Sequence, residues 1–409
     1  MGKHSRLVVG LDVGATKIGA VIGEVSPEGE LEVIGLGHRP SKGVHKGVIV
    51  EIESARDAVM AVLEDAEVMA GARIDAAYVG ISGSQVVEDM AEGTLELRSQ
   101  AITAREVQQV MEKAQSAVGT GDRAILHVVP QEFTLDGEEG IPNPIGLSGA
   151  KLGARVKVMT APAPVMEALR RVMDLARVEV REVVARQLAS AEGVLTGDEK
   201  ELGVGLIDIG GSSADIAVYR GGLPLCIRSL GVGGNHITHD LAVGLRTPVS
   251  EAERLKQQFG CALLSLVKAE EMVAVGPARG KEGHVFPRKF LAEIIEARVE
   301  EMFALALHQI HQGGFQAPLS GGIVLTGGAS VMPGMVQAAE AVFEMPVRLG
   351  LPRDIGGLTD LISSPTYAAG VGLAKYAWRR HLEGESPRTQ HLPFGRLFRR
   401  LAYWVQDLF

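Results

Sequence analysis

The sequence predicts a mixed α/β protein, and three glycine-rich segments carry that prediction. Two of them, 10–24 and 204–222, each contain a buried strand, an Asp-x-Gly turn with small polar residues and a second strand. The third, 322–334, is a buried strand followed by a Gly-Gly turn and the expected start of a helix. Glycine in such turns lets the backbone bend sharply and approach a ligand closely.

The two hairpins are predicted to hold phosphate from opposite sides. Successive backbone N–H groups in a turn of this kind form a concave cradle for an anion. Asp12 and Asp208, one in each hairpin, could then hold a hydrated Mg²⁺ through one or two carboxylates. A single Asp-x-Gly hairpin is also what an ordinary tight turn looks like, because Gly and Asp are common turn residues. The prediction therefore depends on the pair and on the third segment.

Length and composition narrow the possible classes. A chain of 409 residues is long for one domain and suggests two to four, and 46% apolar residues are enough for real cores. A net charge of −9 argues against nucleic acid as the main partner. Cys226 and Cys261 lie outside any metal-binding pattern, so both are predicted to be buried thiols in a reducing compartment. No apolar run is long enough to span a membrane, and no signal peptide is expected.

Further elements follow from local patterns along the chain. A β-meander is expected over 6–37 with a turn at 27–29, and an amphipathic helix over 51–70. Thr103 and Glu106 form a capping-box pattern that predicts the start of another helix. Additional strands are expected at 76–81, 124–129 and 154–159, and a helix with basic ends is expected over 287–298.

The three glycine-rich segments resemble the phosphate-1, phosphate-2 and adenosine motifs of the actin, Hsp70 and sugar-kinase ATPase superfamily. That resemblance implies an actin-like ATPase fold, in which two related α/β domains enclose a cleft for ATP. A closer resemblance is to the bacterial cell-division protein FtsA family. It runs from residue 6 to 380 and through the last sixteen residues, and is most specific in the segments 46–53, 125–137, 140–149, 188–191, 199–204 and 233–235.

The resemblance to the FtsA family implies a domain plan. Subdomain 1A would comprise 1–83, 161–198 and 358–380, with an inserted subdomain 1C at 84–160. Subdomain 2A would comprise 199–240 and 315–357, with subdomain 2B at 241–314. A linker at 381–392 and an amphipathic membrane-targeting helix at 393–409 would complete the chain.

The resemblance also assigns nucleotide-binding residues. Phosphate would be bound by Gly14, Ala15, Thr16, Lys17, Gly210, Gly211, Ser212, Ser213, Gly233, Gly234 and Asn235, and adenosine by Glu253, Lys256, Gly327 and Gly328. Asn235 is a plausible N-cap residue, and a helix beginning there would offer N–H donors to phosphate. Two alternatives stay open at this point: Lys17 as a solvated surface residue, and Glu253 as the capping-box partner of Ser250.

One departure from the superfamily pattern concerns hydrolysis. Many of these ATPases place a Glu or Gln where it orients the attacking water, and positioning that water is a large part of phosphoryl transfer. The corresponding segment here is 185–191, without the Glu-Pro that several relatives carry. Gln187 is the candidate catalytic residue, although it could instead cap or pack. We therefore expect ATP binding with slow hydrolysis.

The last residues have the pattern of a helix that lies in a membrane interface. Apolar side chains fall on one face and arginines on the other, after a polar linker with Gly and Pro. Anionic lipids would attract the arginines. A helix docked on its own protein shows the same apolar stripe and is the alternative. The candidate membrane-binding residues are Arg396, Leu397, Phe398, Arg399, Arg400, Leu401, Trp404, Val405, Leu408 and Phe409.

The resemblance implies an adaptor in cell division. Such a protein binds ATP, forms filaments on the membrane, tethers the tubulin-like FtsZ polymer to the cytoplasmic face of the bacterial inner membrane at the division site, and recruits later division proteins. Subdomain 2B would receive the FtsZ C-terminal peptide, with Arg288 and Arg298 pairing with its acidic groups unless they are ordinary surface arginines. The alternatives are a small-molecule kinase, an Hsp70-like chaperone and a pilus-assembly adaptor.

Overall fold

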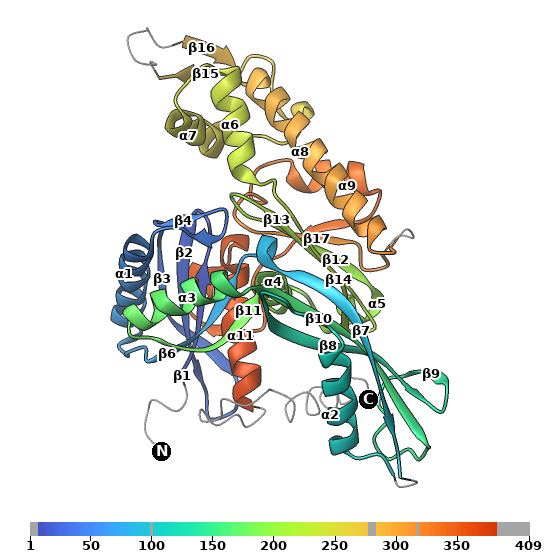
Figure 1. Cartoon of the computed structure of the whole chain (residues 1–409). Coiled ribbons are helices and arrows are strands. Elements are labelled where there is room, and N and C mark those ends of the chain that lie inside the picture. The colour runs from blue at the N-terminus through green and yellow to red at the C-terminus, as the bar shows by residue number, and fades with distance from the viewer. Residues whose placement is uncertain (1–6, 99–100, 277–283, 316–318, 383–409) are drawn as a thin grey trace.

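The fold is built from two β-sheets that repeat one topology, as seen in a computed structural model that describes residues 7–98, 101–276, 284–315 and 319–382 (Figure 1). In each sheet a three-stranded antiparallel meander is followed by two strands that lie parallel to its first strand. The duplication confirms the predicted pair of related α/β halves and the actin-like fold class.

The first sheet has the strand order β11-β6-β1-β2-β3-β19. The helices α1 (Ile52–Ala70) and α3 (Ala163–Leu175) pack against it through a shared apolar core. A Cβ atom on Gly37 would lie 2.0 Å from the backbone oxygen of Val62, so a glycine is needed where α1 crosses β3. The strands are β1 (Leu7–Val13), β2 (Lys17–Val25), β3 (Leu31–Pro40), β6 (Ala76–Ile81), β11 (Glu179–Ala185) and β19 (Gly356–Gly357), with a small hairpin of β4 (Val44–His45) and β5 (Val48–Ile49) beside them.

The second sheet has the strand order β14-β13-β12-β17-β18. All six residues of β12 are buried, and Asp208 near its end lies opposite Asp215 of β13. The helices α5 (Gly197–Leu202) and α9 (Met335–Phe343) belong to this half. Its strands are β12 (Val204–Ile209), β13 (Ala214–Arg220), β14 (Leu223–Leu230), β17 (Ile323–Thr326) and β18 (Val347–Leu349).

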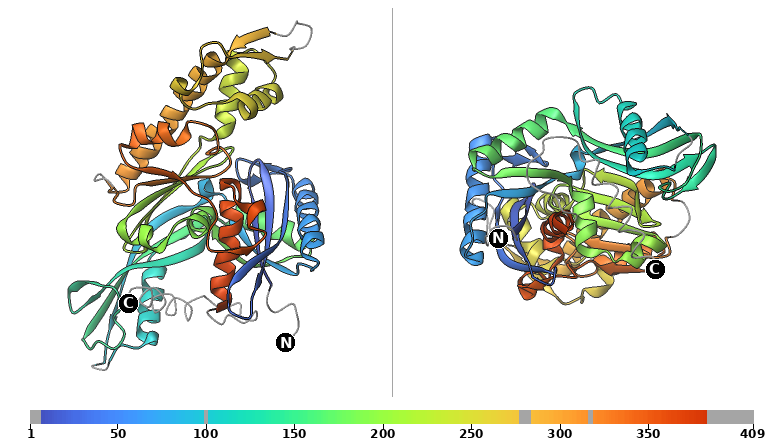
Figure 2. Two further views of the ribbon diagram at one scale, coloured as in Figure 1. Left: turned by 180° about the vertical axis from the view of Figure 1, so that it is seen from behind. Right: turned by 90° about the horizontal axis from the view of Figure 1, so that it is seen from below.

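Two helices lie between the sheets, α4 (Arg186–Val194) and α11 (Ala368–Leu382), and they pack directly on each other (Figure 2). Glycines make this close approach possible, because a Cβ on Gly372 would lie 1.7 Å from the Ala189 oxygen and one on Gly193 would lie 2.4 Å from the Ala368 oxygen. The short helices α10 (Thr359–Ile362) and η4 (Pro365–Tyr367) lead into α11. The two halves therefore meet at a tight helix–helix crossing.

A separate four-stranded sheet with the order β7-β10-β8-β9 occupies the region predicted to be an insertion. The predicted capping box is confirmed, because Thr103 and Glu106 bond reciprocally at the start of α2 (Ala104–Ser116). Figure 1 shows this part at the opposite end of the molecule from the lobe that carries α6 and α8. Its remaining elements are η2 (Gly83–Gln85), β7 (Val87–Glu96), β8 (Arg123–Leu135), β9 (Glu138–Ile141) and β10 (Lys151–Pro162).

The other lobe consists mainly of helices that pack on one core with the second sheet. The 25-residue helix α8 connects the lobe to the body, and it runs well beyond the predicted 287–298. The elements are α6 (Gly234–Gly244), α7 (Val249–Phe259), η3 (Leu264–Leu266), β15 (Met272–Val275), β16 (His284–Pro287) and α8 (Arg288–Gln312).

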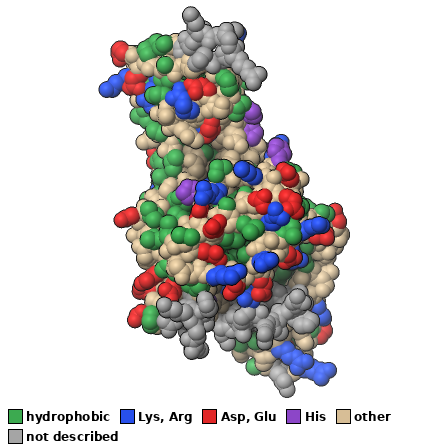
Figure 3. All heavy atoms as spheres, turned by 90° about the vertical axis from the view of Figure 1, so that its left-hand side faces the viewer, with side chains coloured by type: hydrophobic (Ala, Val, Ile, Leu, Met, Phe, Trp, Pro, Cys, Tyr) green, Lys and Arg blue, Asp and Glu red, His purple; other side chains and the backbone are tan. Residues whose placement is uncertain are grey.

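Three smaller features concern the cysteines, the surface charges and the helices. Cys226 and Cys261 are both buried and unpaired, as predicted. On the face shown in Figure 3, acidic and basic side chains are interleaved. Among the helices of the described ranges, none has the length and apolar character needed to cross a membrane.

Candidate functional site

The three glycine-rich segments line one cleft of about 480 Å³ between the two halves. The structure thus brings together segments that are about two hundred and one hundred residues apart in sequence. Predicted residues in its wall are Gly14, Ala15, Thr16, Lys17, Asp208, Gly210, Gly211, Ser212, Ser213, Gly234, Asn235, Glu253, Lys256, Gly327 and Gly328. Sequence reasoning missed Ser82, Arg186, Gln257, Ala329, Val331, Met332, Pro333, Pro365, Thr366 and Ala369.

Each of the two hairpin turns is closed by an equivalent backbone hydrogen bond. The N–H of Gly14 donates to the Lys17 oxygen at 3.0 Å, and the N–H of Gly210 donates to the Ser213 oxygen at 2.9 Å. This equivalence follows from the repeated Asp-x-Gly pattern. Both turns line the cleft, each from its own sheet.

The third segment closes over the second hairpin. Gly327 has a φ of +88°, which glycine adopts at little cost, and a Cβ there would lie 2.3 Å from the Asp208 Oδ1 atom. The N–H of Ala329 donates to the Ile209 oxygen at 3.0 Å. The Gly-Gly turn is therefore dictated by its close approach to β12.

The start of α6 differs from the prediction. Gly233 is the N-cap residue, so the assignment of Asn235 to that position is wrong. The N–H groups of Gly234 and Asn235 donate to the oxygens of Gly210 and Gly211, at 2.9 and 2.7 Å. Because α6 begins directly against the second turn, its first N–H groups hold that turn in place rather than pointing free into the cleft.

Glu253 and Lys256 lie on one face of α7 and line the cleft, as their spacing predicted. The capping-box alternative for Glu253 is wrong, because α7 starts after Pro248 without a side-chain cap. Glu253 instead lies 2.7 Å from the Lys256 Nζ atom and accepts a 2.5 Å hydrogen bond from the Thr238 hydroxyl. Lys256 also donates to the Gly234 oxygen at 3.0 Å, which fixes its ammonium beside the second turn.

Lys17 is not a solvated surface residue. Its Nζ atom donates to the Thr366 oxygen at 2.5 Å and lies 4.8 Å from the centre of the Tyr367 ring. Burial lowers the pKa of Lys17 to about 8, with Asp12 opposing this shift and Arg186 adding to it. The ammonium is thus held at the cleft wall with an unusually acidic proton.

The predicted metal pair, Asp12 and Asp208, is bridged by a side chain that the prediction left out. Arg186 Nη2 lies 3.2 Å from Asp12 Oδ2, and Arg186 Nε lies 3.7 Å from Asp208 Oδ2. Burial disfavours the charged guanidinium, but Asp12, Asp208 and Asp215 outweigh it and raise the pKa of Arg186. A pair of carboxylates already compensated in this way does not fit a divalent cation in the present arrangement. Within the described ranges, no cluster of three or more His, Cys, Asp or Glu side chains could hold a metal ion.

Gln187, the predicted catalytic residue, lies behind the cleft wall. It is buried, and its amide nitrogen lies 3.5 Å from the Arg228 oxygen. A Cβ on Gly83 would lie 2.2 Å from the same nitrogen, so η2 covers the side chain. Neither Gln187 nor Asp12 nor Gly233 is among the residues that line the cavity.

The two arginines predicted to pair with a peptide are already paired within the chain. Arg288 lies 2.5 Å from Glu271 and donates to the Phe259 oxygen at 2.8 Å. Arg298 forms a two-pronged contact with Asp240 and a further ion pair with Glu301. The predicted linker and membrane-binding residues from 383 onward lie outside the described residues.

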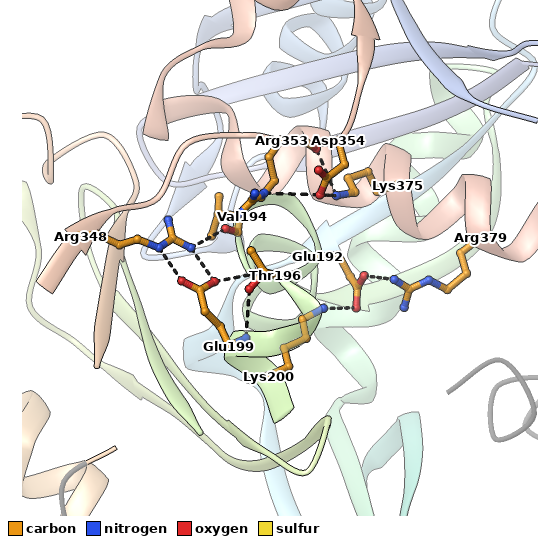
Figure 4. Close-up of polar contacts among 10 residues, drawn as sticks. All are labelled: Glu192, Val194, Thr196, Glu199, Lys200, Arg348, Arg353, Asp354, Lys375 and Arg379. Atoms are coloured by element: carbon orange, nitrogen blue, oxygen red, sulfur yellow. Dashed lines mark hydrogen bonds and ion pairs between the residues drawn. The ribbon is translucent and has the colours of Figure 1, made fainter. Parts of the chain in front are cut away.

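An ion network ties α4 to α11 and to the second half behind the cleft (Figure 4). Glu192 of α4 pairs with Lys200 at 3.1 Å and with Arg379 of α11. Arg348 of β18 makes a bidentate contact with Glu199, at 2.6 and 2.7 Å. Figure 4 shows Glu192 between its two cations, at the junction through which the halves are joined.

The duplicated sheets and the cleft between them define an actin-like fold. The chain resembles the PilM–PilN type IV pilus biogenesis complex at a TM-score of 0.66 and 16% identity, over 91% of this chain and 98% of that one. It resembles MreB5 of Spiroplasma citri bound to ADP at a TM-score of 0.54 and 15% identity, over 93% and 99%. A chain of the MamK double helical filament matches at a TM-score of 0.52 and 14% identity, over 91% and 98%.

Sequence comparison gives the particular family. The model of cell division protein FtsA matches residues 205–372, and that of the SHS2 domain inserted in FtsA matches 83–160. FtsA of Pseudomonas aeruginosa is 37% identical over 413 residues, covering 100% of this chain and 99% of that protein. FtsA of Escherichia coli K12 is also 37% identical, over 99% and 98%, and FtsA of Neisseria meningitidis is 34% identical over the full length of both. The chain belongs to the FtsA family of bacterial cell division proteins.

Proposed function

We propose that the protein is an ATP-binding adaptor that anchors the FtsZ polymer to the cytoplasmic face of the inner membrane during division. The main observation is that both Asp-x-Gly turns line one cleft. The chain that contains this cleft is related to FtsA along its whole length. Both Asp-x-Gly turns line this cleft, as a cradle for phosphate requires, and so do Glu253 and Lys256, to which we assign adenosine contact. Filament formation and recruitment of later division proteins belong to the same proposal.

Membrane attachment is assigned to the last seventeen residues. Their sequence combines an apolar face with Arg396, Arg399 and Arg400 on the other side, the pattern of an interfacial helix. Each arginine near an anionic surface contributes roughly 1 kcal/mol of attraction. Attachment is therefore expected to depend on both the apolar face and the negative charge of the lipid.

Hydrolysis is expected to be slow. Positioned water is a large part of phosphoryl-transfer catalysis, and Gln187 lies behind the cleft wall rather than in it. We expect turnover below the roughly 1 s⁻¹ low end of ordinary enzyme rates. A high rate of phosphoryl transfer to a small-molecule acceptor would favour the kinase alternative, which requires an acceptor site in the same cleft.

The test is co-sedimentation of the full chain and of a chain ended after Leu392 with two kinds of vesicle. Phosphatidylethanolamine–phosphatidylglycerol vesicles supply anionic lipid, and phosphatidylcholine vesicles are the control. FtsZ with and without its C-terminal peptide is added to each. The proposal requires the full chain to carry intact FtsZ to the anionic vesicles, and the shortened chain and the shortened FtsZ to stay in solution. Sedimentation that is the same for both chains would overturn the assignment of the tail.

The arginines of the tail allow a finer comparison. The double substitution Arg399→Glu and Arg400→Glu keeps the apolar face and reverses two charges. It is expected to abolish binding to anionic vesicles if electrostatic attraction is required. The matched control, Arg170→Glu with Arg171→Glu on α3, reverses the same number of charges away from the tail and should leave binding intact.

A further inference from the structure

The position of Arg186 in the wall of the cleft is the feature that the proposed function does not explain. Arg186 is the first residue of α4, and it lies between Asp12 of β1 and Asp208 of β12, one carboxylate from each half of the molecule. Only 14% of its side chain is exposed, against 5% and 2% for the two aspartates. A guanidinium in this place connects the two hairpins and lines the nucleotide cleft at the same time.

Two cations already offset the two carboxylates that were predicted to bind a metal ion. Asp12 and Asp208 supply two negative charges, and Arg186 and Lys17 supply two positive ones at the same end of the cleft. Asp215 adds a third carboxylate beside Asp208, and it accepts a 2.6 Å hydrogen bond from the Ser229 hydroxyl. Mg²⁺ bound through Asp12 and Asp208 would lie against a fixed guanidinium, and repulsion between two cations in a buried site is costly.

Arg186 also keeps donors for a ligand. The guanidinium carries five N–H donors in a planar fork that suits phosphate oxygens. Its Nε atom is buried without a hydrogen-bond partner among the described residues, and so is the Asp208 Oδ1 atom. A Cβ on Gly14 would lie 3.4 Å from Arg186 Nη1, so the guanidinium lies directly beneath the first phosphate turn. The same group can therefore contact both carboxylates and a terminal phosphate.

We propose that Arg186 serves as a built-in cation of the nucleotide site, taking the place between Asp12 and Asp208 that a divalent metal would otherwise take. The chain consequently binds the polyphosphate of a nucleotide without needing Mg²⁺. The inference rests on the proposed binding of ATP in this cleft and concerns how its phosphates are neutralised. It replaces the Mg²⁺ that the two aspartates suggested from sequence.

Two other roles for Arg186 make different predictions. In the first, Arg186 is a plug that Mg²⁺–nucleotide displaces, so binding requires the metal. In the second, Arg186 only neutralises two buried carboxylates, and its replacement reduces the stability of the protein without changing the metal requirement of binding. Measurements of affinity with and without a divalent cation separate all three roles.

The experiment is calorimetric titration of the full chain with the non-hydrolysable analogue AMPPNP, in excess Mg²⁺ and in excess EDTA. For the unaltered protein we expect affinities within about threefold of each other in the two conditions, a difference of well under 1.4 kcal/mol. For Arg186→Gln we expect binding in EDTA to weaken by tenfold or more, and Mg²⁺ to restore most of that loss. Arg186→Lys keeps the charge and should remain largely independent of Mg²⁺.

A control variant, a check of folding and a separate measurement of metal binding accompany the titrations. Arg39→Gln removes an arginine that pairs with Asp65 on the outer face of α1, and it should bind as the unaltered protein does in both conditions. Circular dichroism establishes that each variant is folded before titration. Manganese binding to the nucleotide-free chain, followed by electron paramagnetic resonance, should be absent in the unaltered protein and appear in Arg186→Gln.

Three results would overturn the inference. Affinity of the unaltered protein that falls tenfold or more in EDTA would identify Arg186 as a displaced plug. An Arg186→Gln variant with the affinities of the unaltered protein in both conditions would leave Arg186 a purely structural role. Absence of AMPPNP binding in every condition would instead remove the proposed nucleotide function, and the inference with it.

Discussion

Thr16 on the first phosphate turn and Gly211 on the second are in such close contact that a Cβ atom at position 211 would lie 2.2 Å from the Thr16 Cγ2 atom. The same Cβ would lie 3.2 Å from the Thr16 Cβ, so rotation of the threonine side chain does not fully relieve the overlap. The two turns come from different sheets, and the width of the cleft is therefore limited by this contact.

Substitution of Gly211 by alanine should push the two turns apart and weaken nucleotide binding. We expect Gly211→Ala to reduce affinity by about tenfold, which corresponds to roughly 1.4 kcal/mol. The double variant Gly211→Ala with Thr16→Ser removes the threonine methyl and should recover part of the loss, as coupled neighbours do. Gly231→Ala is the matched control, because a Cβ there meets nothing within 4 Å. Equal losses for Gly211→Ala with and without Thr16→Ser would contradict the contact.

Nucleotide affinity should fall as pH rises above about 8. Burial lowers the pKa of Lys17 to about 8, so its ammonium is charged at pH 7 and increasingly neutral by pH 9. Phosphate interacts with the charged form, and the protein must take up a proton to bind at high pH. We expect affinity for ATP to drop roughly fivefold from pH 7 to pH 9, an effect of about 1 kcal/mol.

The variant Lys17→Gln identifies the titrating group. It should bind more weakly at pH 7 and show almost no further change up to pH 9, since the side chain no longer titrates. Calorimetric titration at several pH values measures both curves. A fall of the same size in Lys17→Gln would assign the pH dependence to another group.

Glu192 is expected to stabilise the junction of the two halves. Burial alone would raise the pKa of Glu192, but Arg379, Lys200 and Lys375 outweigh it and hold that pKa well below its usual value of 4.5. Because the folded-state pKa is lowered, the stabilisation is present above pH 4.5 and is lost as pH falls below it. Glu192→Gln should cost about 3–5 kcal/mol of unfolding free energy at pH 7, the usual cost of breaking a buried pair.

Urea unfolding from pH 7 to pH 4 measures this effect. The loss of stability on acidification should be smaller in Glu192→Gln than in the unaltered protein. Glu53→Gln removes an exposed partner of Arg56 on α1 and should change the unfolding free energy by less than about 1 kcal/mol. A Glu192→Gln variant as stable as this control would show that the network in Figure 4 contributes little.

Arg298 should bind an acidic peptide better once Asp240 is neutralised. Asp240 accepts two hydrogen bonds from Arg298, at 2.5 and 3.0 Å, and so occupies the donors that a peptide carboxylate would need. We expect Asp240→Asn to raise affinity for the FtsZ C-terminal peptide by about two- to threefold, since partly exposed pairs contribute less than about 1 kcal/mol. Arg298→Ala should lower it.

Fluorescence anisotropy with a labelled FtsZ peptide measures these affinities. Asp65→Asn on α1 frees Arg39 of β3 in the same way and should leave peptide affinity unchanged. If both aspartate variants raised peptide affinity equally, the cause would be the change in net charge. If Arg298→Ala had no effect on peptide affinity, the peptide would bind elsewhere.

Local sequence patterns predicted much of the fold because they reflect interactions between residues that are close together in the chain. The Thr103–Glu106 capping box, the helix at 52–70 and the three glycine-rich turns depend on backbone geometry within a few residues. The wrong assignment of Asn235 has a tertiary cause, because the second turn accepts the first N–H groups of α6 and moves the cap to Gly233. Glu253 likewise pairs with Lys256 and Thr238 because α6 and α7 pack together.

The sequence by itself determined that two Asp-x-Gly turns and a third glycine turn exist, because glycine and short polar residues restrict what each local segment can form. The resemblance to the FtsA family was also visible in the sequence alone. Only the tertiary structure decided that Arg186 lies between Asp12 and Asp208 and that Lys17 reaches Thr366. These contacts join residues that are from 22 to 349 positions apart in sequence. These groups meet only because folding brings both sheets onto α4 and α11, and burial strengthens the electrostatic interactions between them.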